Sequence, residues 1–267
     1  MTLKTWLKIV IWSLVLTLTV VVLYLSESVE RNQLIGSPEI SIRYHGEDVI
    51  LTEQELLYRL KNNSLYAENQ KAEELDFRKI EEAIQKMSEV KECNVFKQYG
   101  GKWGIDMELR HPIARIIDRN KNHYFLDKEG FLMKSKPNIV CRVPLITGKI
   151  PKIKEENFVS EIINKDSLIS NRILQDIYTF SVYVCDNPFL SSLITQIDVD
   201  ERGSFDLIPL IGDYIIKVGK VESDASLKDK MFRLENFYKK GIPFEGWNKY
   251  SEINLSYDGQ IVCKKRS

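Results

Sequence analysis

Residues 90–110 read VKECNVFKQYGGKWGIDMELR and decide the fold of the first half of the chain. Over 103–110 every second residue is apolar, as expected for a strand with one buried and one solvated face. Gly100 and Gly101 supply the positive φ values that a tight turn requires. The stretch therefore predicts a β-hairpin, with the partner strand over 90–98.

One strand and two helices are expected before this hairpin. Residues 39–44 alternate apolar and polar side chains, which predicts a strand. Thr52 to Glu55 forms the capping box T-x-x-E and predicts the start of a short helix. A second helix is expected over 76–88, where apolar residues form one stripe at helical spacing: Phe77, Ile80, Ile84 and Met87. The resulting order, β-α-α-β-β, predicts a small α+β domain over 38–117.

The remaining residues, 118–267, read as a strand-rich domain with packed helices. Helices are expected over 166–184, from apolar residues recurring every four positions, and over 226–240, before Gly241. The chain then closes in a hairpin with Asp258-Gly259 at its turn. Strands are expected at 113–117, on both sides of the turn 127–130, and at 143–148, 193–199, 204–211, 213–220, 250–257 and 260–264. The fold class is therefore α+β throughout.

An apolar run without any charged residue covers 9–26. With Trp6 and Leu7 added, about twenty residues span roughly 30 Å as a helix, the thickness of a bilayer core, and helix is the state expected in lipid. Lys4 and Lys8 precede it, so the rule that positive charge stays inside places 1–8 in the cytoplasm as a short tail. The expectation is a single-pass protein whose bulk lies outside. A cleaved signal peptide is the alternative, but Ser26-Glu27-Ser28 is a poor cleavage site.

Composition excludes several classes of protein. The chain has 267 residues with 38 basic and 38 acidic side chains, so it lacks the basic excess of a nucleic-acid binder. A hydrophobic content of 43% is too high for a disordered chain. The four cysteines contain no C-x-x-C pair: Cys93, Cys141, Cys185 and Cys263. An extracytoplasmic location permits disulfides, but the sequence equally allows free, partly buried thiols.

No catalytic site is readable. The three histidines, His45, His111 and His123, are isolated from any nucleophile or metal-binding motif, and we interpret them as surface residues. The sequence predicts no catalytic residue, cofactor, metal ion or small-molecule substrate.

Four stretches, taken in order, carry a resemblance to a known family. They are Leu109-Arg-His-Pro-Ile-Ala-Arg115, Phe125-Leu-Asp-Lys-Glu-Gly130, Val143-Pro-Leu-Ile-Thr-Gly148 and Leu255-Ser-Tyr-Asp258. In this order, after an N-terminal anchor, they resemble the FtsQ/DivIB family of bacterial cell-division proteins. Two features depart from the family pattern: Ser256 replaces an arginine, and 150–190 is longer and more helical.

The resemblance implies a transmembrane helix at 9–26, a POTRA-like domain at 38–117 and an FtsQ-type β-domain at 118–267. It also implies a non-enzymatic divisome scaffold in the cell inner membrane at the division septum, with its bulk in the periplasm. The implied partners are FtsB and FtsL, and the implied role is to help recruit and regulate septal peptidoglycan synthesis.

By β-augmentation, the partner would bind the late hairpin at Tyr257, Asp258, Gly259, Gln260, Ile261 and Val262. Two other functions stay open at this point: a membrane-anchored cell-wall enzyme with a divergent active site, and a different POTRA-containing assembly factor.

Overall fold

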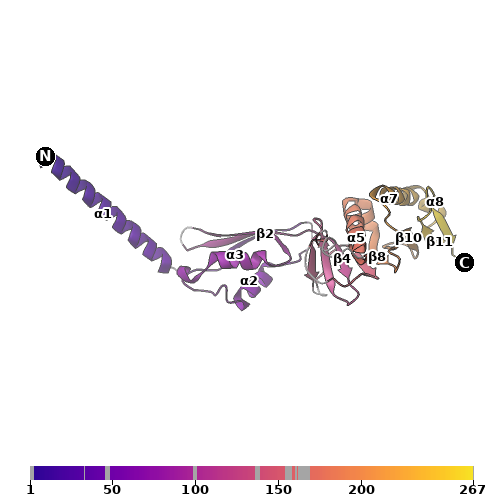
Figure 1. Cartoon of the computed structure of the whole chain (residues 1–267), viewed down its shortest axis with the longest axis horizontal. Coiled ribbons are helices and arrows are strands. Elements are labelled where there is room, and N and C mark those ends of the chain that lie inside the picture. Colours follow the sequence, from indigo (N-terminus) through magenta and orange to yellow (C-terminus); the bar gives the residue numbers. More distant parts are fainter. Residues whose placement is uncertain are drawn as a thin grey trace. The chain divides into compact units, whose positions relative to one another are not determined.

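A computed structural model describes residues 3–32, 34–45, 49–98, 101–135, 139–153, 158–159, 161 and 169–266 (Figure 1). The chain divides into two compact units. The first comprises Met1–Arg43 and Leu51–Leu109, and the second comprises Tyr44–Ile50 and Arg110–Ser267. Each unit has its own sheet.

The chain begins with a long helix, α1 (Leu3–Asn32). Its described apolar side chains, such as Trp12 and Leu23, are exposed to solvent. Among the helices that the structure describes, none is both long enough and apolar enough to cross a membrane. The membrane anchor over 9–26 therefore stays a prediction.

The first unit contains a three-stranded sheet in the order β1-β3-β2. The hairpin of β2 (Val90–Lys97) and β3 (Trp103–Leu109) confirms the prediction from its alternating sequence. β1 (Glu39–Arg43) pairs with β3 in parallel. The apolar side chains of β3 are buried: Trp103, Ile105, Met107 and Leu109.

Both predicted helices of this unit begin where the sequence predicts, each after a capping residue. Thr52 caps α2 (Glu53–Asn62), and its hydroxyl accepts a hydrogen bond from the Glu55 N–H at 3.2 Å. Asp76 caps α3 (Phe77–Gln85) in the same way. A 3₁₀ turn at Ala72–Glu74 was not predicted. With that addition, the observed order matches the β-α-α-β-β prediction.

The second unit is built on a nine-stranded sheet in the order β12-β11-β10-β9-β8-β7-β4-β5-β6. β8, β9 and β10 form the predicted antiparallel meander. The pairs β4–β7, β7–β8 and β10–β11 are parallel, which the sequence did not indicate. The strands are β4 (Pro112–Ile117), β5 (His123–Asp127), β6 (Leu132–Ser135), β7 (Leu145–Gly148), β8 (Ile194–Val199), β9 (Phe205–Pro209), β10 (Ile215–Gly219), β11 (Tyr250–Asn254) and β12 (Val262–Lys265).

Two long helices, α5 (Ile169–Asp186) and α7 (Asp224–Lys240), pack against this sheet (Figure 1). Phe180 of α5 stacks on Phe205 of β9 with ring centroids 5.3 Å apart. Leu227 and Met231 of α7 are buried in the same core. The helix predicted over 226–240 is confirmed, with Ser223 as its N-cap. For α5, the predicted start at 166–168 lies outside the described residues.

Two short helices correct the sequence interpretation. The sequence predicts only the end of the helix 166–184 near Asn187, but this residue also caps a new helix, α6 (Pro188–Leu193). Its side-chain oxygen accepts hydrogen bonds from the next two N–H groups, and proline suits the first helical turn. Gly241 was likewise expected to stop α7, yet α8 (Ile242–Glu245) comes directly after it.

The closing hairpin has shorter strands and a longer connecting loop than predicted. The expected strands 250–257 and 260–264, joined at Asp258-Gly259, are wrong in extent, because β11 ends at Asn254 and β12 starts at Val262. The Leu255 N–H donates to the Lys217 carbonyl of β10 at 2.7 Å instead of pairing with β12. The Leu255 side chain is fully buried. Residues 255–261 therefore form a loop that is packed onto the unit.

Candidate partner-binding edge

Among the strands that the structure describes, β12 forms one edge of the nine-stranded sheet and pairs with β11 alone. An edge strand leaves alternate main-chain N–H and C=O groups without a strand partner, which is how a sheet accepts an additional strand. The geometry of β11 shows which groups of β12 these are.

Alternate residues of β11 face opposite neighbours. The N–H of Leu255 is bonded to β10, so the main-chain N–H and C=O groups of every second residue of β11 before it also point toward β10. The main-chain groups of Asn254 and Glu252 point the other way, toward β12. Asn254 lies opposite Val262, and Glu252 lies opposite Lys264. The main-chain groups of Val262 and Lys264 therefore point inward, toward β11.

The other two residues of β12 consequently point their main-chain groups outward. These residues are Cys263 and Lys265. The same alternation continues past the strand, where the Arg266 N–H donates inward to the Lys249 carbonyl at 3.0 Å. The open edge thus offers the N–H and C=O of Cys263 and Lys265.

The loop 255–261 is held against α7 by one arginine. Nη1 of Arg233 donates to the carbonyl oxygens of Tyr257, at 3.0 Å, and Gln260. Nε of Arg233 donates to Asp229 at 2.8 Å, which orients the guanidinium. The Tyr257 side chain itself is 50% exposed. Its backbone is thus fixed while its ring remains available for contact.

A hollow of about 430 Å³ lies between this loop and α7. Its lining includes Phe237 and Lys240 of α7 and Gln260 and Ile261 of the loop. Ile261 directly precedes β12, so the hollow adjoins the start of the edge strand.

The structure places the predicted site residues in two parts. Residues 257–261 lie in the loop, and Val262 begins β12. The open edge itself offers the main-chain groups of Cys263 and Lys265, which the prediction did not include. Continuing the alternation through the last strand was the signal that could have found them. Burial raises the pKa of the Cys263 thiol, so the group is held as a neutral thiol.

The histidines are not arranged as a catalytic set. His45 and His111 stack on each other with ring centroids 5.5 Å apart. Burial and nearby Arg115 lower the pKa of His123. Within the residues that the structure describes, no group of His, Cys, Asp or Glu side chains is arranged to hold a metal ion. All four cysteines are free thiols.

The fold defines a class of α+β protein in which a POTRA-like unit is followed by a strand-rich unit with an open edge. The comparisons agree with this class: residues 36–108 match the POTRA-like domain family, and residues 111–264 match the family described as FtsQ/DivIB, C-terminal related. The chain belongs to this FtsQ/DivIB-related family. No curated protein matches the chain. Family membership connects it to cell division and to protein–protein interactions of the divisome.

Proposed function

We propose that this protein is a divisome scaffold that binds FtsB and FtsL and thereby helps recruit and regulate septal peptidoglycan synthesis. The observation that carries the proposal is the open edge of β12, with the main-chain groups of Cys263 and Lys265 directed outward. A partner strand that pairs with these groups would extend the sheet by one strand.

The surface around the edge adds specificity to main-chain pairing. Tyr257 offers a half-exposed ring as an anchor, and aromatic anchors often dominate binding energy. Lys264 and Lys265 are exposed on β12. Their charge favours an acidic partner segment and speeds its approach at low salt.

We further propose that 9–26 anchors the protein in the cell inner membrane as a single pass, with the bulk in the periplasm at the division septum. The uninterrupted apolar sequence and the preceding Lys4 and Lys8 support this topology. The POTRA-like unit would then take part in recruitment to the septum. A reporter that is active only in the periplasm, fused at the C-terminus, must be active if this topology is right.

Co-purification from native membranes tests the scaffold role. Tagged protein should recover FtsB and FtsL, and Tyr257→Asp should reduce their recovery while the thermal unfolding midpoint stays unchanged. Tyr58→Asp, a matched change at an exposed tyrosine of α2, should recover both partners normally. Depletion should give filamentous cells with normal DNA segregation. Unchanged recovery by the Tyr257 variant would show that the partner binds elsewhere.

A further inference from the structure

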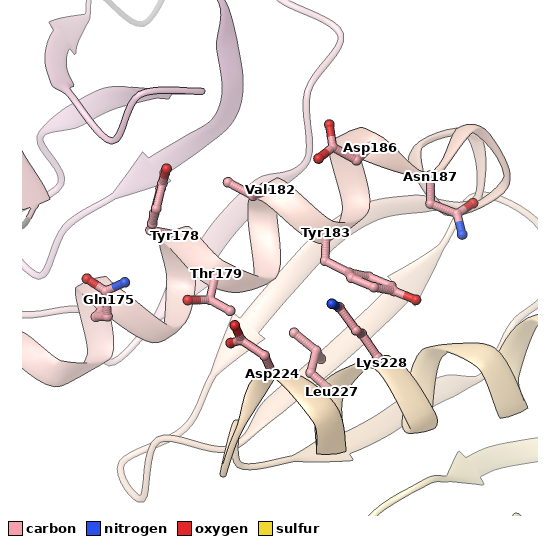
Figure 2. Close-up of a pocket in the computed structure, with 10 residues that line it drawn as sticks. All are labelled: Gln175, Tyr178, Thr179, Val182, Tyr183, Asp186, Asn187, Asp224, Leu227 and Lys228. Atoms are coloured by element: carbon pink, nitrogen blue, oxygen red, sulfur yellow. The ribbon is translucent and has the colours of Figure 1, made fainter.

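A groove of about 660 Å³ lies between α5 and α7, apart from the edge of β12 (Figure 2). This volume falls within the range of small-molecule sites, about 300–1,000 Å³. α5 lies in the stretch 150–190, which departs most from the family pattern. One wall of the groove is therefore formed by a helix that the family resemblance does not explain.

The two helices direct side chains toward each other across the groove. Thr179 and Tyr183 point from α5 toward α7, and Asp224 and Lys228 point back from α7 (Figure 2). Leu227, which is buried, lies between the last two and gives the groove an apolar part. The lining thus combines an aromatic ring, an apolar surface and several polar groups.

Some polar groups of the lining are already used by the fold. Lys128 forms an ion pair with Asp186 at 2.8 Å, and its carbonyl accepts a hydrogen bond from Tyr178. Asn187 caps α6. These contacts orient the side chains of Tyr178, Asp186 and Asn187 in the lining.

Other polar groups of the lining have no such use. Among the described residues, none forms a hydrogen bond or ion pair with the side chains of Gln175, Thr179, Asp224 or Lys228, nor a hydrogen bond with the Tyr183 hydroxyl. Together they present an amide, two hydroxyls, a carboxylate and an ammonium. Such a set both donates and accepts hydrogen bonds from several directions.

The charges in the groove are balanced. Asp186 is neutralised by Lys128, and Asp224 and Lys228 carry opposite charges. A phosphate would meet carboxylates in this lining, and a cation would meet the Lys228 ammonium. A purely apolar ligand would leave the polar groups desolvated and unpaired, which is costly.

We propose that the groove between α5 and α7 binds a neutral oligosaccharide. A sugar ring carries hydroxyls that both donate and accept, which suits the unpaired groups of Gln175, Thr179 and Asp224. Its C–H face suits the Tyr183 ring, whose face is electron-rich. This site is separate from the β12 edge and does not depend on the proposed scaffold function.

Isothermal titration of the full-length protein tests the proposal. The protein is kept in a detergent without a sugar headgroup, and the probes are cellotetraose, maltotetraose and chitotetraose. At least one of these should show saturable binding at one site per chain. Tyr183→Ala should weaken that binding about tenfold, the upper limit for one aromatic contact. Tyr183→Phe, which keeps the ring, should weaken it less.

Two further variants guard against misfolding and misplacement of the site. Asp224→Asn alters an exposed residue that is not the helix cap and should weaken binding several-fold without changing thermal unfolding. Phe232→Ala removes an exposed ring of α7 outside the groove and should bind like the wild type. Failure of all three sugars to bind overturns the proposal. So does sugar binding that none of the groove variants weakens, or saturable binding of inorganic phosphate instead.

Discussion

Arg110 and Asp127 form a nearly buried ion pair, with Nη1 of Arg110 lying 2.9 Å from Oδ2 of Asp127. Their side chains are only 12% and 3% exposed. Asp127 also accepts the N–H groups of Glu129 and Phe131, and the Arg110 guanidinium lies 4.1 Å from the centroid of the Phe131 ring. Two of the stretches that carry the family resemblance are therefore joined by one contact. The pair fixes the entry to β4 against the turn after β5.

Removal of the Asp127 carboxylate should therefore destabilise the second unit. We expect Asp127→Ala to lower the free energy of unfolding by about 3 kcal/mol, because it leaves the nearly buried Arg110 charge with only the longer contact to Glu129, at 3.7 Å. Urea unfolding measures this loss. Lys128→Ala breaks the neighbouring exposed pair with Asp186 and should cost less than about 1 kcal/mol. Equal losses in the two variants would contradict a structural role specific to Asp127.

Replacement of Arg233 should release the loop 255–261. Arg233→Ala removes the donors to the Tyr257 and Gln260 carbonyls, and hydrogen bonds from charged groups are worth about 1.5–3 kcal/mol. Amide hydrogen exchange in the loop should become faster, and recovery of FtsB should fall. Lys239→Ala, on the exposed side of the same helix, should leave both unchanged. Unaltered exchange in the Arg233 variant would show that the loop is held by other contacts.

A proline substitution on β12 distinguishes partner binding through main-chain hydrogen bonds from partner binding through side chains. Lys265→Pro removes an N–H that points away from β11, so the sheet should stay intact while partner capture is lost. Lys265→Ala keeps that N–H and should retain most of the capture. Both variants are compared by co-purification and by thermal unfolding. If the proline variant binds its partners as well as the alanine variant does, strand addition at β12 is wrong.

The raised pKa of Asp206 predicts how the free energy of unfolding depends on pH. It lies opposite Asp198 on β8, and burial raises its pKa, with Asp198 and other carboxylates adding to the effect and Lys217 opposing it. Because the pKa is higher in the folded protein than in the unfolded chain, stability rises as the pH falls through this folded value. Asp206→Asn should therefore stabilise the protein at pH 7.

The same reasoning gives the control for Asp206. The gain from Asp206→Asn should vanish below about pH 3, where the carboxyl is protonated in both states. Asp258→Asn changes an exposed loop carboxylate and should show no comparable gain. Thermal unfolding between about pH 2 and pH 8 measures both. A gain for Asp206→Asn that persists at low pH would show that charge is not its cause.

Local sequence patterns predicted most helices and strands correctly. Thr52 and Asp76 start their helices because a cap acts within one turn, and the alternation in β3 reports burial of one face. The same kind of reasoning missed α6 and α8, because Asn187 and Gly241 can end one helix and begin another. Short-range patterns thus define an element but not always the next element along the chain.

The candidate site was predicted only in part. Val262 begins β12, but Tyr257 lies in the loop before it, and that loop is held by Arg233, which is remote in sequence. Nothing near residue 257 in the sequence indicates that an α7 guanidinium holds its carbonyl. For the same reason, the groove between α5 and α7 was not foreseen.

The α+β class, the family resemblance and the positions of most elements can be read from the sequence, because they depend on residues close together in the chain. The sheet order and the identity of its edge strand emerge from the three-dimensional structure alone. The parallel pairing of Ile216 with Ile253, for example, joins segments separated by the whole of α7. Such pairing depends on how buried faces pack in three dimensions, and local periodicity carries no record of the partner strand.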